Sequence, residues 1–312
     1  MEELVVVLFC MTAFLLGLWH VIHHVVQQPT MSGDKWHIRH MAFTGLPVSA
    51  PYCWRPLHPF LGRLFGFYGV SYAASLATPI LIYYWMGSGW RGFLVALLFL
   101  GNSNIFPFHV RNPEYAESVG HLLFISALWA IQVGSPLAYP LVLLCALCRE
   151  TIAAALLVVA AVWNPWLCIP IVAGSASAYF TRKEDKSNLH PLVESTPYET
   201  LKRWLRIKGY AVISYAHVLQ PIRGLAITVP LMWGRVGDFA RVGTLGLIPI
   251  WLLALPASGQ SRIICYGFAL IAPFAAELPI GWLWGFVFLT WFWPIDIAQY
   301  KESGSRDFGF VR

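Results

Sequence analysis

Residues 34–59, DKWHIRHMAFTGLPVSAPYCWRPLHP, form a polar segment between the first two long apolar runs of the chain. The segment contains one acid, one lysine, two arginines, three histidines and four prolines. With its flanks it makes a polar stretch of about 38 residues, from Gln28 to Phe65. A connection between two neighbouring helices needs only a few residues, and long ordered loops tend to carry function. We therefore expect any chemistry of this protein to begin here.

The composition indicates a polytopic membrane protein. Of the 312 residues, 58% are hydrophobic and only 12% are charged, whereas soluble domains carry about 25% charged residues. The mean hydropathy is +0.61. The chain is also rich in tryptophan, tyrosine and phenylalanine, which is typical of membrane interfaces. The first apolar run lacks the basic start of a cleavable signal, so we expect it to be a retained helix.

Net charge and cysteines narrow the possible partners. The net charge of +6 fits anionic lipid headgroups or a phosphate-bearing substrate. We expect no nucleic-acid partner, because no basic repeat or basic patch interleaved with aromatic residues is visible. Cys145 and Cys148 lie three positions apart within an apolar run, so we expect free thiols in a core rather than a zinc site or a disulfide framework.

The apolar runs predict an all-α membrane bundle of about ten or eleven spans, at about 20 residues for a full crossing. We expect a single transmembrane domain over residues 1–300 and a polar tail over residues 301–312. Its two polar islands are the first loop, residues 28–65, and a second loop, residues 181–209. The predicted runs are residues 4–26, 66–87, 91–107, 119–133, 137–148, 150–163, 165–180, 211–233, 244–257, 262–276 and 279–297.

The second half of residues 181–209 has the pattern of an interfacial helix. Thr196 and Glu199 form a capping box around Pro197 at the first helical position. Leucine and tryptophan side chains on one face then alternate with lysines and arginines on the other. Two interpretations fit this pattern equally: a helix that lies on the bilayer, and a helix that borders an entrance for a lipid substrate.

The first loop supplies the first candidates for chemistry. Asp34 is surrounded by Lys35 and other basic residues, so its carboxylate should stay ionised and could take a proton from an incoming hydroxyl. An ordinary turn-capping role explains the same residue. Arg55 and His58 follow at the start of the second helical region, where an arginine either holds a phosphate through its forked donors or extends to headgroups. The prolines beside them favour a fixed, non-helical path.

Two further clusters interrupt the apolar sequence. Residues 112–117, Asn-Pro-Glu-Tyr-Ala-Glu, precede the fourth span, and we expect Asn112 to cap it. Helix capping explains Glu114 well, but it explains Glu117 less well. Arg149 and Glu150 are adjacent residues, which do not face each other on a helix, so each needs a different partner. The helical runs on either side of them are either two half-helices or one long tilted helix.

The histidines allow a redox interpretation. His20, His23 and His24 end the first span, while His121 and His217 fall within apolar runs. A haem-binding subunit needs histidines that face each other from two helices. Lone helix histidines are more often simply hydrogen-bonded, and the pattern permits haem without specifying it.

The order of these motifs resembles polytopic glycosyltransferases of the GT-C class, which use lipid-linked sugars. The resemblance covers roughly residues 1–276. It rests on a first membrane helix, an acid in the following loop (Asp34), Gly-Leu-Pro at 45–47, Tyr-x-Trp-Arg-Pro-Leu-x-Pro at 52–59, a later acid among Glu114 and Glu117, Arg-Glu-Thr at 149–151 before an apolar helix, and Ser261-Arg262 before another.

The resemblance implies a transferase that takes a sugar from a polyprenyl-phosphate carrier. By position Asp34 would be the base or would position the acceptor, and Glu114 or Glu117 would act on the acceptor or as a second acid. The carrier phosphate would be held by arginines, for which Arg55, Arg149 and Arg262 are the candidates. Lys35, His58 and Glu150 complete the predicted binding residues. No cofactor is required with certainty, although a divalent cation is compatible with this chemistry.

The resemblance also bears on location and partners. Such enzymes lie in the bacterial inner membrane with the first loop outside the cytoplasm. The positive-inside rule predicts the opposite for residues 28–65, but a phosphate-binding loop is basic for reasons unrelated to insertion. The chain is short for the class, so it is either a minimal enzyme or a non-catalytic subunit that keeps the fold, bound to membrane-protein partners. A transporter or flippase of a lipid-linked or anionic substrate is a further alternative.

Overall fold

The computed structural model describes residues 33–44, 55–102, 105–180, 225–254 and 263–292, with residues 3–5, 7, 8, 11, 12 and 15 of the first apolar run. Within these ranges the chain is mostly helical and has no strand, which confirms the all-α prediction. The second polar loop with its expected interfacial helix, and the tail at residues 301–312, lie outside the described residues.

The helices follow the predicted apolar runs closely. Some predicted runs are divided in the structure. Residues 91–107 form α5 and α6, residues 165–180 form a 3-10 helix (Pro165–Leu167) and α10, and residues 244–257 begin with a 3-10 helix (Thr244–Gly246) followed by α15. The α-helices are α2 (Gly33–Thr44), α3 (Leu57–Phe65), α4 (Phe67–Trp85), α5 (Trp90–Gly101), α6 (Phe106–Arg111), α7 (Glu117–Gln132), α8 (Ala138–Cys148), α9 (Glu150–Trp163), α10 (Cys168–Phe180), α13 (Thr228–Met232), α14 (Asp238–Gly243), α15 (Leu247–Ala254), α17 (Gly267–Ala276) and α18 (Ile280–Phe292).

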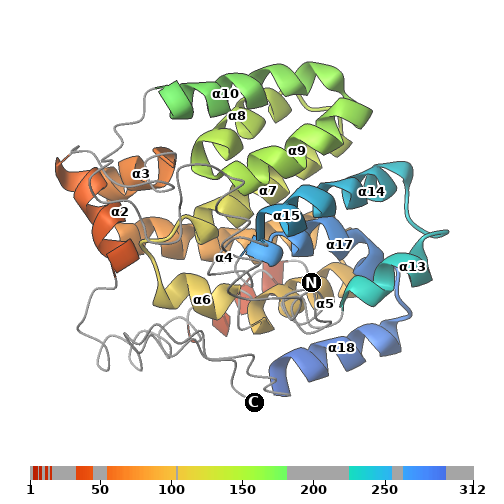
Figure 1. Cartoon of the computed structure of the whole chain (residues 1–312). Helices are drawn as coiled ribbons and strands as arrows, with labels where there is room; N and C mark the ends of the chain where they lie inside the picture. The colour runs from red at the N-terminus through yellow and green to blue at the C-terminus, as the bar shows by residue number, and fades with distance from the viewer. Residues whose placement is uncertain are drawn as a thin grey trace, which may run out of the picture.

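Helices α4 and α7 form the centre of the bundle and pack against each other (Figure 1). Helices α8, α9 and α10 pack together on one side of α7, while α5 and α18 pack together on the other side of α4. Helices α2 and α3 lie together at one end (Figure 1). Residues distant in sequence therefore meet where α2 and α3 approach the beginning of α7.

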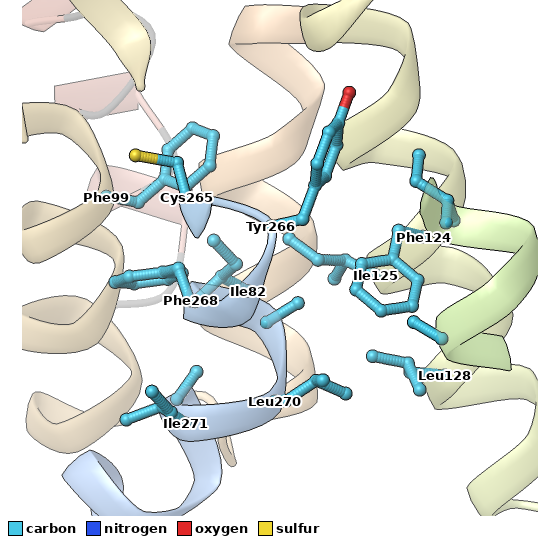
Figure 2. Close-up of a cluster of buried hydrophobic side chains, with 14 of the residues drawn as sticks. Ile82, Phe99, Phe124, Ile125, Leu128, Cys265, Tyr266, Phe268, Leu270 and Ile271 are labelled. Atoms are coloured by element: carbon cyan, nitrogen blue, oxygen red, sulfur yellow. The ribbon is translucent and has the colours of Figure 1, made fainter. Parts of the chain in front are cut away.

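The core between these helices is apolar and closely packed. Tyr266 and Phe268, at the start of α17, lie between Phe99 of α5 and Phe124 of α7 (Figure 2). Helix α7 can come this close because of Gly120, where an added Cβ would lie 2.5 Å from the Tyr266 hydroxyl oxygen. Helix packing in apolar surroundings relies on such close approach of small residues.

The first polar loop contains more regular structure than its prolines predict. Residues 33–44 form α2, and α3 begins at Leu57, directly after Pro56. The expected non-helical path is therefore wrong for Leu57–Pro59. Proline is tolerated in the first turn of a helix, because the N–H group it lacks has no partner within the helix there.

A sharp bend separates α3 from α4. Gly66 between them has a φ of +77°, a conformation that side-chain-bearing residues rarely adopt. Among the described helices, none is by itself both long and apolar enough to cross a membrane. Helices α3 and α4 pass that test only as a pair, with an angle of 109° between them.

The chain also breaks between α8 and α9. Arg149 has extended backbone angles, φ −162° and ψ 131°, so α8 ends at Cys148 and α9 begins at Glu150. Arg149 thus lies in the break itself and Glu150 at the start of α9, and the two runs form separate helices rather than one long helix. This geometry points their side chains at different partners.

Candidate functional site

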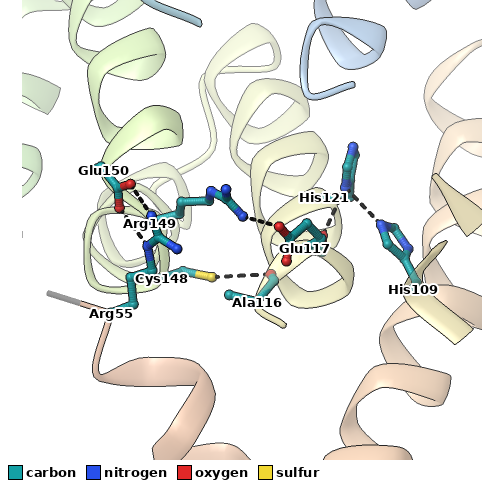
Figure 3. A network of polar contacts seen from close by, with 8 residues as sticks. All are labelled: Arg55, His109, Ala116, Glu117, His121, Cys148, Arg149 and Glu150. Atoms are coloured by element: carbon teal, nitrogen blue, oxygen red, sulfur yellow. Dashed lines mark hydrogen bonds and ion pairs between the residues drawn. The ribbon is translucent and has the colours of Figure 1, made fainter. Parts of the chain in front are cut away.

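Three arginine–glutamate ion pairs gather where α2, α3, α7 and α9 approach one another. They join Arg39 to Glu114, Arg55 to Glu150 and Arg149 to Glu117. Each pair links residues at least 32 positions apart in sequence. Figure 3 shows two of these pairs beside each other, with Arg149 and Glu150 turned toward different partners, as their adjacency predicts.

Arg55 and Glu150 form the first pair, at the edge of the protein. The Nε atom of Arg55 donates to Oε2 of Glu150 at 2.9 Å, and Nη2 donates to Oε1, so the contact is bidentate. The side chains are 15% and 35% exposed, respectively. This contact uses two of the five N–H groups of the guanidinium, and Nη1 takes no part in it.

Arg149 and Glu117 form the second pair, inside the bundle. Their contact is 2.5 Å, and both side chains are less than 5% exposed. The guanidinium lies over the Tyr266 ring, 5.4 Å from its centroid, which adds a cation–π contact. A pair this deeply buried is expensive to break, because either charge alone would lack compensation.

Glu114 and Arg39 form the third pair, with a distance of 2.6 Å between Nη2 and Oε1. Glu114 lies in the turn before α7, and its side chain is buried. The second carboxylate oxygen, Oε2, is buried and has no hydrogen-bond partner among the described residues. An unpaired buried carboxylate oxygen costs free energy unless something binds it, so Oε2 is a strong candidate for contact with a ligand.

His58 on α3 lies beside this carboxylate. Its Nε2 atom is 3.0 Å from the carbonyl oxygen of Pro113, and its ring packs against Phe67. Burial lowers the pKa of His58 below its ordinary value, because the charged ring would lose its hydration. The ring is therefore neutral near pH 7.

Arg55, His58 and Glu114 line the same small pocket. Its walls are apolar and come from α2, α3 and the turn before α7, namely Ile38, Met41, Pro59, Tyr115 and Ala116. The space open to the centre of a water molecule is about 10 Å³, which is room for roughly one water molecule. A guanidinium, a carboxylate and an imidazole therefore line a pocket that has room for roughly one water molecule.

A second polar cluster lies deeper, around two histidines. His109 Nε2 and His121 Nδ1 are 3.2 Å apart (Figure 3), and the His121 ring stacks on Tyr266 with 4.4 Å between centroids. His121 also contacts the carbonyl oxygens of Glu117 and Cys265, at 2.9 and 3.3 Å. The other histidines considered for haem, His20, His23, His24 and His217, lie outside the described residues.

The structure brings together six of the nine predicted site residues: Arg55, His58, Glu114, Glu117, Arg149 and Glu150. Asp34 and Lys35 fall in the first turn of α2, but their side chains are not part of the description. Arg262 lies outside the described residues altogether.

Asn112 does not cap α7 as the sequence predicts. Helix α7 begins at Glu117, after a turn in which Tyr115 donates its N–H to the carbonyl oxygen of Asn112. The side chain of Asn112 instead donates to the carbonyl oxygen of Phe108 in α6, at 3.2 Å. The intervening turn frees Glu114 from helix capping and turns it toward Arg39.

Sequence reasoning missed three residues of this region. Arg39 was visible only as one basic residue near Asp34, and no sequence signal pairs it with Glu114. His109 lies just after a predicted apolar run and Tyr266 lies within one, and their hydrogen-bond or ring partners come from other elements of the fold. Sequence spacing does not reveal such partners.

Within the described ranges no group of three or more histidine, cysteine, aspartate or glutamate side chains is arranged to hold a metal ion. Cys145 and Cys148 are free buried thiols, as the sequence predicts. Comparison with protein-family models, with curated proteins and with solved structures found no match to this chain. Its function is therefore argued from the geometry of the site.

Proposed function

We propose that this chain is a polytopic membrane glycosyltransferase of GT-C-like organisation, which moves a sugar from a polyprenyl-phosphate donor to a hydroxyl acceptor. The proposal includes residence in a bacterial inner membrane, with the 28–65 segment on the extracytoplasmic side. The observation that carries it is the small pocket that Arg55 and His58, at the start of α3, share with Glu114 from the turn before α7. All three residues are among those that the sequence motifs predict for the site.

The outer surface of the bundle supports residence in a membrane. Large apolar side chains are exposed on helices at opposite sides of the fold, among them Trp166 and Phe180 near the ends of α10, and Trp282 and Phe288 on α18. Extended apolar surface of this kind marks contact with a lipid or protein phase rather than water. In this proposal α3 lies at the membrane interface and α4 continues from it into the bilayer.

The site offers separate groups for the two halves of the reaction. Arg55 stands at the edge of the protein with N–H groups that the Glu150 contact does not use, which suits the phosphate of a lipid carrier. Glu114 is buried, and its Oε2 atom has no partner among the described residues, which suits a general base. Arg149 is committed to Glu117 in the interior, so the proposed phosphate contact is assigned to Arg55.

The proposed reaction balances with these groups alone. The acceptor oxygen attacks the anomeric carbon of the donor sugar and forms the new glycosidic bond. The bond between that carbon and the phosphate oxygen breaks, and its electron pair leaves with the polyprenyl phosphate. The acceptor proton passes to Glu114, and Arg55 compensates the charge of the departing phosphate. Asp34, near the N-terminus of α2, is the alternative base from the family resemblance.

The proposal is tested with purified protein in lipid and a polyprenyl-phosphate donor whose sugar is radiolabelled. The measurement follows the loss of the labelled sugar from the donor. We expect Glu114→Gln to reduce transfer at least 100-fold with donor binding retained, while Arg55→Gln weakens donor binding. Asp34→Asn is measured in parallel, and full activity of that variant removes Asp34 from the mechanism. Glu277→Gln, in an ion pair with Arg91 elsewhere on the protein, is the matched control. Unchanged transfer in both pocket variants would refute the assignment.

A non-catalytic accessory subunit is the second candidate function. Two observations favour it. All three arginines already have glutamate partners, and the pocket has room for only roughly one water molecule. A subunit of this kind would bind no polyprenyl phosphate. It would instead copurify with a membrane-protein partner whose activity survives Glu114→Gln.

A further inference from the structure

Helix α3 has one face turned into the protein and one face turned out of it. His58, Pro59 and Gly62 are buried against the rest of the fold. Phe60 and Leu64, four positions apart and therefore on one face of the helix, are 58% and 56% exposed. The packing of the chain accounts for the inner face and leaves the outer, apolar face uncovered.

Further apolar side chains are exposed at the same end of the bundle, where α2 and α3 lie together (Figure 1). Phe65 ends α3 and is 69% exposed, and Tyr68 in the first turn of α4 is 42% exposed. Phe43 of α2 is 62% exposed, and its ring centroid is 6.3 Å from that of Phe67. Large exposed apolar side chains gathered in this way mark contact with lipid or with another protein.

One charged residue lies beside this apolar face. Arg63 is exposed, follows Phe60 by three positions and directly precedes Leu64. It forms no ion pair with any residue that the structure describes. A basic side chain beside exposed aromatic and leucine side chains is the pattern of a helix in a membrane interface, where the stem lies among apolar groups and the guanidinium reaches a phosphate.

The direction of α3 favours a lipid surface over a protein partner. The bend at Gly66 sets α3 at 109° to α4, which is close to perpendicular. If α4 enters a bilayer along its normal, α3 lies nearly parallel to the membrane plane. This is the orientation in which an amphipathic helix inserts its apolar face at the boundary between headgroups and acyl chains.

We infer that the outer face of α3 docks on acidic phospholipids, with Phe60 and Leu64 among the acyl chains and Arg63 at a headgroup phosphate. The inference rests on the proposed function for the place of α3 at a membrane interface, and it adds the contact face and the class of lipid. His58 lies on the inner face, so the docked lipid and the pocket occupy opposite sides of the helix.

A photoactivatable phosphatidylglycerol tests this contact directly. The purified protein is placed in nanodiscs that contain this lipid, or phosphatidylcholine with the same reactive group, and the cross-linked peptides are mapped by mass spectrometry. We expect labelling of residues 57–65 that is at least threefold stronger with phosphatidylglycerol, because only this lipid carries a net negative charge. Arg63→Gln should remove that preference. Arg235→Gln, at an exposed arginine outside α3, is the matched control and should keep it.

The depth of the helix is measured with a nitroxide label at Leu64→Cys, after subtraction of the signal from the unsubstituted protein. We expect the label to collide more with oxygen, which concentrates in the bilayer, than with a neutral nickel complex, which stays in water. A label at Asp238→Cys, where the side chain is 80% exposed, should show the reverse. Preferential collision with nickel at residue 64, or equal lipid preference in Arg63→Gln and Arg235→Gln, would overturn the inference. Protection from both reagents would identify a protein on this face instead of lipid, and would overturn it too.

Failure of this inference differs from failure of the proposed function. If phosphatidylglycerol labels α3 in a way that depends on Arg63 but no sugar leaves the donor, the lipid surface stands and the transferase role falls. If sugar is transferred while the label at residue 64 collides mainly with nickel, the transferase stands and the lipid surface is refuted.

Discussion

The adjacent residues Arg149 and Glu150 enter two ion pairs that differ in almost everything except their chemistry. Arg149 pairs with Glu117 inside the bundle, where both side chains are less than 5% exposed. Glu150 pairs with Arg55 at the edge, where both partners reach solvent. One break in the chain, between α8 and α9, creates both arrangements.

The difference in burial suggests different roles for the two ion pairs: the buried pair stabilises the fold, and the partly exposed pair is accessible to a ligand. In the interior both charges have lost their hydration on folding. If one partner is removed, water cannot take its place and the other charge stays uncompensated. At the edge water or a phosphate can replace the glutamate at modest cost. The interior pair therefore holds α7 to the start of α9, whereas the edge pair can exchange for a ligand.

The largest effect should come from breaking the interior pair. Arg149→Ala leaves Glu117 buried without this partner, so we expect a loss of about 3–5 kcal/mol in the free energy of unfolding. Denaturation of the purified protein in lipid or detergent, followed by tryptophan fluorescence, measures it. The double variant Arg149→Met with Glu117→Leu removes both charges and should recover most of the loss. A loss below about 1 kcal/mol in Arg149→Ala would abolish the distinction between the two regions.

The second-largest effect should come from the contact between Gly62 and Phe67, which packs α3, the helix that follows Arg55, against α4. An added Cβ at Gly62 would lie 2.3 Å from the Phe67 ring, across the bend between α3 and α4. Gly62→Ala must displace that ring or the helix, so we expect a cost of about 1–3 kcal/mol. Gly69→Ala on α4, where an added Cβ meets nothing within 4 Å, is the matched control. Equal stability of the two variants would show that the bend is not held by this contact.

A smaller effect on stability, with a larger one on binding, is expected at the edge pair. Arg55→Ala removes a bidentate partner from the half-buried Glu150, so it should cost about 1–2 kcal/mol in the free energy of unfolding, less than the loss of the buried pair. Binding of a polyprenyl phosphate should fall at least tenfold, because the arginine facing the phosphate is lost. Equilibrium binding of the labelled lipid measures this, and unchanged affinity would place the phosphate elsewhere.

The smallest effect is expected for an ion pair on the surface of α14. Arg241 and Asp238 lie one turn apart on α14, 2.9 Å from each other, with side chains that are 34% and 80% exposed, and Arg241 also donates to the carbonyl oxygen of Trp233. Arg241→Ala should change the free energy of unfolding by at most about 0.5 kcal/mol. The variant thus gives the baseline for arginine removal in the same assay. A cost as large as that of Arg149→Ala would mean that burial does not govern these pairs.

The helices were largely predictable from the sequence, since long apolar runs bounded by glycine, proline and charged residues mark them well. The separate partners of Arg149 and Glu150 also followed from local rules, whereas the sequence left open whether the chain breaks at Arg149. Helix α3 was missed because its prolines read as breakers, although the first turn of a helix tolerates them.

The pairing of the site was not predictable in the same way. Arg39 and Glu114 are 75 positions apart, and nothing in local spacing assigns one to the other. The same holds for the His109–His121 contact and for the Tyr266 ring that packs on His121, because these depend on how α6, α7 and the start of α17 pack. Local patterns named most of the polar residues, and only tertiary packing decided which face the interior.

The central claim is that the edge of this site holds a lipid phosphate while its interior holds an acceptor hydroxyl. An experimental density map of the purified protein with an added polyprenyl phosphate tests it most directly. We expect phosphate density within hydrogen-bond distance of Arg55, with the Glu150 contact loosened and the Arg149–Glu117 pair intact. Lipid phosphate bound away from Arg55, or density that displaces Glu117 from Arg149, would contradict the account.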